Sequence, residues 1–155
     1  MAKEIERKFL VKDNSYAEMA TCVRHIRQTY LSTAPHATVR IRISDDEAWI
    51  TVKGLNHGVS RDEWEYQIPK SDAEEMAASL AGGWSVDKYR YIVEYEDWKW
   101  EIDRYAGPLE GLTVAEVEMP ETTANPPLPP FIGKEVTGDV RYYNSSLAES
   151  GKKPD

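Results

Sequence analysis

The chain has 155 residues, a length typical of one domain, and we place that domain at residues 1–150 with a disordered tail at residues 151–155. A net charge of −8 argues against a general nucleic-acid or anionic-membrane binder, so we expect neither partner. The single cysteine, Cys22, excludes an internal disulfide bond and fits a reducing compartment. The sequence has no apolar run long enough to cross a membrane, and its charged start does not resemble a signal peptide, so we expect a cytoplasmic protein.

Alternation of apolar and polar residues with a period of two dominates the sequence and predicts that most of the chain is strand. Short turn signals separate several of these segments, as at residues 44–46 and 95–97, and connections this short imply antiparallel neighbours. The predicted strands are residues 4–11, 26–31, 38–44, 48–53, 61–68, 86–94, 98–103 and 113–119.

Helix signals are few. Ser71 and Glu74 match a capping box that begins a helix, and the glycines at 82 and 83 end it. Weaker patterns predict a helix over residues 15–24, which would bury Cys22, and a short helix over residues 144–149. The proline-rich residues 120–130 predict an extended loop.

Charged side chains gather on one face of each predicted strand and are sorted by sign, because residues i and i+2 share a face. Two such residues lie about 7 Å apart, where like unit charges repel by about 2 kcal/mol at an effective dielectric constant of about 20. The like-charged pairs are Arg40/Arg42, Lys88/Arg90, Glu4/Glu6, Glu63/Glu65, Glu101/Asp103 and Glu116/Glu118.

Two architectures fit this pattern. The plainer one is an open amphipathic sheet whose charged face meets water. In the other, which the like-charged pairs favour, the fold class is α+β: a closed eight-stranded antiparallel β-barrel with a polar, charged interior and a few helices packed outside. Such an interior forms a wet tunnel suited to a phosphate chain with metal ions, because arginine and lysine bind phosphate and carboxylates bind Mg²⁺ or Mn²⁺. Trp64 and Trp100 would then lie on outward faces, in the core under helices.

The first charged pair begins an ExExK pattern, Glu4-Ile5-Glu6-Arg7-Lys8. With the segments that follow it, the chain resembles the CYTH superfamily, the triphosphate tunnel metalloenzymes, over roughly residues 2–148. Its size and the final Gly138-Asp139-Val140-Arg141-Tyr142 look like those of short bacterial members, which tend to be inorganic triphosphatases. The other segments that carry the resemblance are residues 38–42, 51–53, 60–65, 87–90, 101–103 and 114–118.

The resemblance implies a tunnel barrel that acts on a triphosphate with a divalent cation. The residues that it implies for substrate binding are Lys8, Arg40, Arg42, Lys53, Arg61, Lys88 and Arg90, with Tyr30 and Arg141 as further contacts. The residues that it implies for metal binding are Glu4, Glu6, Glu63, Glu65, Asp103, Glu116 and Glu118. Homodimers are common among such barrels, so a homodimer is a further expectation.

The hypothesis for the reaction is hydrolysis of inorganic triphosphate to diphosphate and phosphate with two Mg²⁺ or Mn²⁺ ions. One ion, bound to the clusters at Glu4/Glu6 and Glu116/Glu118, would offset the charge of the phosphoryl group during its transfer. A second ion near Glu63/Glu65 would activate a water molecule. We take Lys8, Glu6 and Glu63 as the catalytic residues. Lys8 either neutralises developing charge or acts as a base, and the sequence does not separate these roles.

Three alternatives stay open. A class IV adenylate cyclase, from the same superfamily, would use the 3′-hydroxyl of ATP to attack the α-phosphate. A thiamine or nucleoside triphosphatase would differ only at the mouth of the tunnel. A polyphosphate-binding module would bind without turnover.

Overall fold

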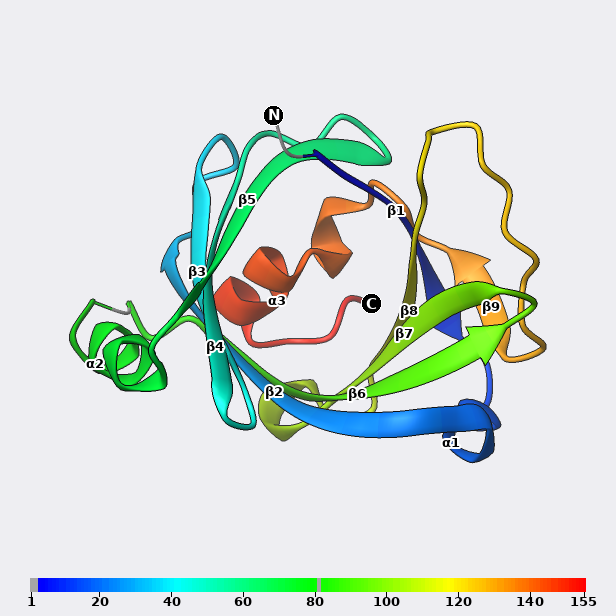
Figure 1. Ribbon diagram of the computed structural model, residues 1–155, viewed down its shortest axis with the longest axis horizontal. Coiled ribbons are helices and arrows are strands. Elements are labelled where there is room, and N and C mark those ends of the chain that lie inside the picture. The colour runs from blue at the N-terminus through cyan, green and yellow to red at the C-terminus, as the bar shows by residue number, and fades with distance from the viewer. Residues whose placement is uncertain (1–2, 81) are drawn as a thin grey trace.

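The computed structural model describes residues 3–80 and 82–155, and strands dominate it. Figure 1 shows them as a ring around a central space. The strands are β1 Lys3–Val11, β2 Ala20–Ser32, β3 Thr38–Ser44, β4 Glu47–Lys53, β5 Ser60–Ile68, β6 Ser85–Tyr95, β7 Trp98–Tyr105, β8 Thr113–Glu118 and β9 Ile132–Glu135. The helices are α1 Tyr16–Met19, α2 Lys70–Leu80 and α3 Asn144–Ser150, with short 3₁₀ turns η1 Gly107–Leu109 and η2 Val140–Tyr142.

Strand β1 closes the ring. The sheet order is β5-β4-β3-β2-β6-β7-β8-β1-β9, and β1 also pairs with β5, so β1 to β8 form a closed antiparallel barrel. Glu4 lies opposite Arg61 on β5, while Lys8 lies opposite Glu116 on β8. The predicted eight-stranded barrel is therefore confirmed, and the open sheet is excluded.

Strand β9 is a ninth strand that the sequence pattern did not predict. It pairs with the far end of β1, where Phe9 lies opposite Glu135 and Val11 opposite Ile132. Its four residues follow the proline-rich loop and are too few to show a period of two.

The predicted helix over residues 15–24 is wrong. Helix α1 has only four residues, and β2 begins at Ala20 and runs for 13 residues. This strand pairs with β6 from Ala20 onward and with β3 from Ile26 onward, and two-sided pairing outweighs the local helix signal. Cys22 is consequently an exposed strand residue rather than a packed helix residue.

The outward faces of the strands carry much of the apolar core. Trp100, fully buried, packs with Phe9 and Tyr16 outside the ring, as expected. Helix α2 covers β3 and β4 and buries Ala73 against Ile41. Trp64 departs from the prediction, because 37% of it is exposed.

Helix α3 lies inside the ring of strands in Figure 1, unlike α1 and α2, which lie outside it. Leu147 and Ala148 are buried in a cluster with Tyr30, Val86 and Tyr105, whose strands form the barrel wall. The helix therefore fills one end of the barrel. It closes the tunnel at that end. The apolar face of such a helix needs apolar side chains on the wall to pack against, and these strands supply them. No helix among the described residues has the length and apolarity to cross a membrane.

Candidate active site in the barrel

A cavity of about 600 Å³ lies inside the barrel, and charged side chains from most of its strands form the wall. Because successive side chains of a strand point to opposite faces, each charged pair expected from the sequence points inward together. The predicted site residues that line the cavity are Glu4, Glu6, Lys8, Tyr30, Arg40, Arg42, Lys53, Arg61, Glu63, Glu65, Arg90, Glu116 and Glu118. Lys88, Asp103 and Arg141 do not line it.

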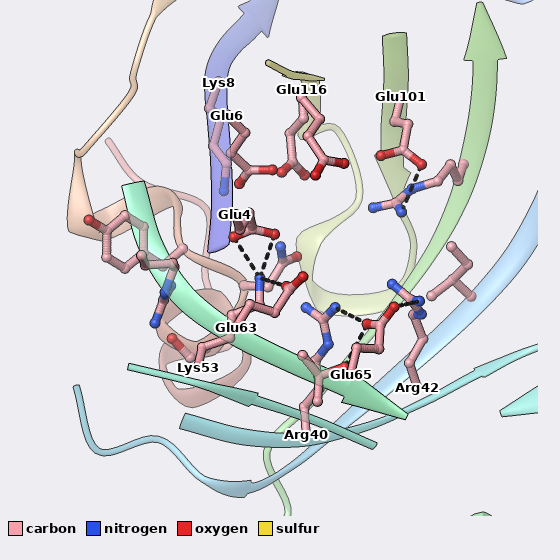
Figure 2. Close-up of a pocket in the computed structure, with 18 of the residues that line it drawn as sticks. Glu4, Glu6, Lys8, Arg40, Arg42, Lys53, Glu63, Glu65, Glu101 and Glu116 are labelled. Carbon is pink, nitrogen blue, oxygen red and sulfur yellow. Dashed lines mark hydrogen bonds and ion pairs between the residues drawn. The ribbon is translucent and has the colours of Figure 1, made fainter. Parts of the chain in front are cut away.

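Three carboxyl groups meet on one side of the cavity, as Figure 2 shows for Glu4, Glu6 and Glu116. Burial, together with the nearby Glu116 and Glu4 carboxylates, raises the pKa of Glu6 well above its ordinary value. Burial also acts to raise the pKa of Glu116, but the Lys8 ammonium and a hydrogen bond with Glu6 outweigh it and lower that pKa. The two carboxyl groups therefore have pKa values shifted in opposite directions, so a shared proton is favoured on Glu6 over Glu116.

Lys53 on β4 contacts carboxylates of the next two strands of the barrel, β5 and β1 (Figure 2). Its Nζ donates to both carboxylate oxygens of Glu4, at 3.0 and 3.1 Å, and lies 3.3 Å from Glu63 Oε2. Burial acts to raise the pKa of Glu4, but the Lys53 charge and a hydrogen bond with Glu63 outweigh it and lower that pKa. Burial and the Glu4 charge raise the pKa of Glu63.

Glu65 holds the arginine pair of β3. Its Oε1 accepts from Arg42 at 3.1 Å, and its Oε2 lies 3.7 Å from Arg40 and accepts from Thr51 at 2.7 Å. The guanidinium of Arg42 also lies 4.9 Å from the ring centroid of Trp49, which lines the cavity. Like charges along one strand are therefore partly offset by opposite charges across the cavity, and the repulsion inferred from the sequence is smaller than the sequence alone indicates.

Arg90, Lys88 and Asp103 form a buried cluster inside the barrel, next to the start of α3, and of the three only Arg90 lines the cavity. Both Asp103 oxygens are used, because Oδ1 accepts from Arg90 Nε at 2.8 Å while Oδ2 accepts from Lys88 Nζ at 2.7 Å. Lys88 and Asp103 are completely buried. Burial lowers the pKa of Lys88 to about 8 even though Asp103 opposes this. Asp103 thus orients Arg90, and the structure does not bring Lys88 or Asp103 to the surface of the cavity.

Two predicted substrate contacts differ in their placement. Arg141 lies outside the cavity, more than half exposed, and pairs with Asp139 at 2.7 Å. Arg61 lines the cavity, and its guanidinium donates to Gly54 O at 2.9 and 3.2 Å.

Lys8 is held from two sides. Its Nζ donates to Tyr142 O at 3.1 Å, and its backbone N–H donates to Thr137 Oγ1 at 2.9 Å. Burial acts to lower the pKa of Lys8, but the Glu116 and Glu6 carboxylates outweigh it and raise that pKa. The lysine is therefore a fixed positive charge beside the carboxyl cluster.

Several wall residues were not among the predicted site residues. Glu101, which pairs with Arg90 at 3.2 Å, was expected on the same strand face as Asp103 but was assigned no role. Four others come from the segment before and at the start of α3, which has no strand period. These are Thr137, Tyr143, Asn144 and Ser145.

The carboxylate-rich wall has the chemistry of a site for a hard divalent cation, because such ions prefer oxygen ligands. Within residues 3–80 and 82–155, no three acidic, histidine or cysteine side chains stand in ligand geometry as they are. The reason is visible in the contacts: Lys53 occupies both oxygens of Glu4, and Glu6 shares a hydrogen bond with Glu116. The donor set fits a divalent cation, which the carboxylate oxygens of Glu4, Glu6 and Glu116 would hold.

Comparison with known proteins agrees with this geometry. The CYTH domain model matches residues 2–149. An inorganic triphosphatase of Acetivibrio thermocellus is 41% identical over 153 residues, covering 99% of this chain and 97% of that protein. One of Nitrosomonas europaea is 38% identical over 151 residues, covering 95% and 97%. A crystal structure of an inorganic triphosphatase, 34% identical, has a TM-score of 0.67 and covers 96% of this chain and 95% of that one. The chain belongs to the CYTH domain family.

Proposed function

We propose that this protein hydrolyses inorganic triphosphate to diphosphate and phosphate in the barrel cavity, with a divalent cation. The observation that carries the proposal is one enclosed cavity in which a basic wall faces a carboxyl cluster. The names of the relatives that are 41% and 38% identical over nearly the whole chain support the same reaction.

The basic residues would bind the phosphate chain. Arg40, Arg42 and Arg90 already have their guanidinium groups oriented by Glu65, Glu101 and Asp103, so little conformational entropy is lost when a phosphate binds. We assign Glu65 to this orienting role rather than to metal binding, because two arginines and Thr51 already surround its oxygens.

The metal would be held by the remaining carboxyl groups, Glu4, Glu6, Glu63, Glu116 and Glu118. Bound Mg²⁺ or Mn²⁺, which we expect as two ions, would neutralise phosphate charge and lower the pKa of a water molecule. Lys8 would neutralise charge on the phosphoryl group in transfer. Its raised pKa argues for this role and against a role as base.

The test is phosphate release from tripolyphosphate with Mg²⁺ or Mn²⁺, before and after chelation with EDTA. We expect Glu6→Gln to lower kcat by at least about 100-fold, because it removes a metal ligand and an essential charge. Glu121→Gln, an exposed change in the loop after β8, is the matched control and should retain full activity. Turnover that persists in EDTA, or that Glu6→Gln leaves unchanged, would contradict the proposal. Assays with ATP, including a search for cyclic AMP, and with thiamine triphosphate separate the other family activities.

A further inference from the structure

Asn144 is the first residue of α3, and its side chain links this helix to the buried cluster of Lys88, Arg90 and Asp103. Its Oδ1 accepts a hydrogen bond from Lys88 Nζ at 3.2 Å and another from the hydroxyl of Tyr105. Lys88 in turn contacts Asp103, which holds Arg90. The amide oxygen of Asn144 is therefore engaged by two side chains of the barrel strands.

The contact with Lys88 decides which way the amide points. A lysine ammonium can only donate, so the opposite amide orientation would place the Nδ2 donor against a positively charged donor, whereas the hydroxyl of Tyr105 can accept as well as donate. With Oδ1 bound to Lys88 and Tyr105, Nδ2 is the polar group of the amide that these bonds leave free, and Asn144 lines the cavity.

The Nδ2 group is accessible and unused. Among residues 3–80 and 82–155, the buried side-chain nitrogen and oxygen atoms that lack a hydrogen-bond partner belong to Gln28, Arg40, Ser44 and Trp100. Asn144 is only partly buried, and the bonds of its side chain in these residues all go to Oδ1. Its two N–H donors are thus left for a ligand in the cavity that Asn144 lines.

We propose that Asn144 is a substrate-binding residue whose Nδ2 donates a hydrogen bond to the terminal phosphoryl group of the triphosphate, at the end of the barrel that α3 closes. This inference rests on the proposed function and adds to it a neutral donor in a wall of charges. The buried Lys88 then acts through Asn144 as a positioning residue that fixes the orientation of the amide.

Asn144→Asp separates a binding role from a structural one. The carboxylate keeps an acceptor for Lys88 and Tyr105. On the cavity side, however, the change replaces a donor with an acceptor that repels phosphate. A hydrogen bond to a charged group is worth enough to predict a rise of about 10- to 100-fold in the Kd and KM for tripolyphosphate.

The experiment measures tripolyphosphate binding by titration calorimetry, phosphate release with Mg²⁺, and the melting temperature. Asn14→Asp, which adds the same charge at an exposed site outside the cavity, controls for net charge. Tyr105→Phe removes one bond to the same Oδ1 and leaves Nδ2 in place, so it controls for structural effects. We expect both controls to bind within about threefold of the unaltered protein, and Asn144→Asp to melt no lower than it.

Asn144→Asp binding within twofold of the unaltered protein would overturn the inference, as would equal weakening in Tyr105→Phe. If Asn144→Asp does not fold, Asn144→Ala compared with Tyr105→Phe makes the same decision, because only the former removes the cavity donor. The two proposals fail differently. Failure of the unaltered protein to hydrolyse tripolyphosphate overturns the proposed function, whereas normal hydrolysis with an unaffected Asn144→Asp overturns only the role of Asn144.

Discussion

At the scale of single residues, the barrel interior contains basic side chains that face the cavity and carboxylates that hold those basic side chains in position. Arg40, Arg42 and Arg90 each reach the cavity while a carboxylate fixes their guanidinium groups. Asp103 is the most buried of these carboxylates and serves two cations at once. A buried ion pair of this kind is costly to break, because the partner that remains keeps its charge without its counter-ion.

Asp103→Asn is therefore expected to lower the free energy of unfolding by about 3–5 kcal/mol, since it leaves Lys88 and Arg90 buried with reduced compensation. The matched control is Asp62→Asn, which breaks the exposed pair with Lys3 and should cost less than about 1 kcal/mol. Urea denaturation followed by tryptophan fluorescence measures both. Equal losses in the two variants would show that the cluster of Lys88, Arg90 and Asp103 contributes no more to stability than a surface ion pair.

At the scale of elements, α3 contributes to both the core and the cavity. One face buries Leu147 and Ala148 against the barrel wall, and its first residue presents Asn144 to the cavity. The helix is only seven residues long, too short to be stable alone, so tertiary packing must hold it in place. The bond from Thr33 Oγ1 to Glu149 Oε2, at 2.7 Å, adds a second attachment.

Leu147→Ala tests how firmly α3 is packed. The side chain is 1% exposed, so its truncation is expected to cost about 2–5 kcal/mol through lost burial and a cavity. Leu80→Ala on α2, where the leucine is 61% exposed, is the control and should change stability by less than about 0.5 kcal/mol. Thermal unfolding measures both. A loss below about 1 kcal/mol for Leu147→Ala would mean that α3 leaves the barrel easily.

At the scale of the whole molecule, a chain with a net charge of −8 surrounds a cavity that is rich in arginine and lysine. The lining of the cavity has eight basic and eight acidic side chains, so the excess of negative charge lies outside the cavity and does not prevent polyanion binding inside the barrel. Low-dielectric walls focus the field of the basic groups on the cavity.

Ligand binding should consequently stabilise the fold. At a tripolyphosphate concentration about one hundred times its Kd, mass action adds about 2.7 kcal/mol, which corresponds to a rise of about 5–10 °C in melting temperature. Sodium sulfate at equal ionic strength is the control and should give a much smaller rise. Differential scanning fluorimetry in EDTA, and again with Mg²⁺, measures the effect. No rise with tripolyphosphate in either condition would contradict binding inside the barrel.

The sequence by itself determined the strands, their inward charged faces and the barrel. A period of two is a local property, so it places Arg40 and Arg42, or Glu116 and Glu118, on one face whatever the partner strand is. The resemblance to the CYTH superfamily, carried by the ExExK segment and the charged pairs, also predicted 13 of the residues that line the cavity. Local signals were insufficient where pairing decides, as at β2, which pairs on both sides and replaces the expected helix.

Only the tertiary structure decided which oppositely charged side chains contact each other. Lys53 and Glu4 are far apart in the sequence, and they meet because β1 closes the barrel against β5. The same closure, with α3 at one end, hides Lys88 and Asp103 and exposes Asn144. Strand periodicity says which face a side chain takes. The depth of that side chain in the barrel, and the element that covers it, depend on strand register and on the path of the last residues, which no local pattern contains.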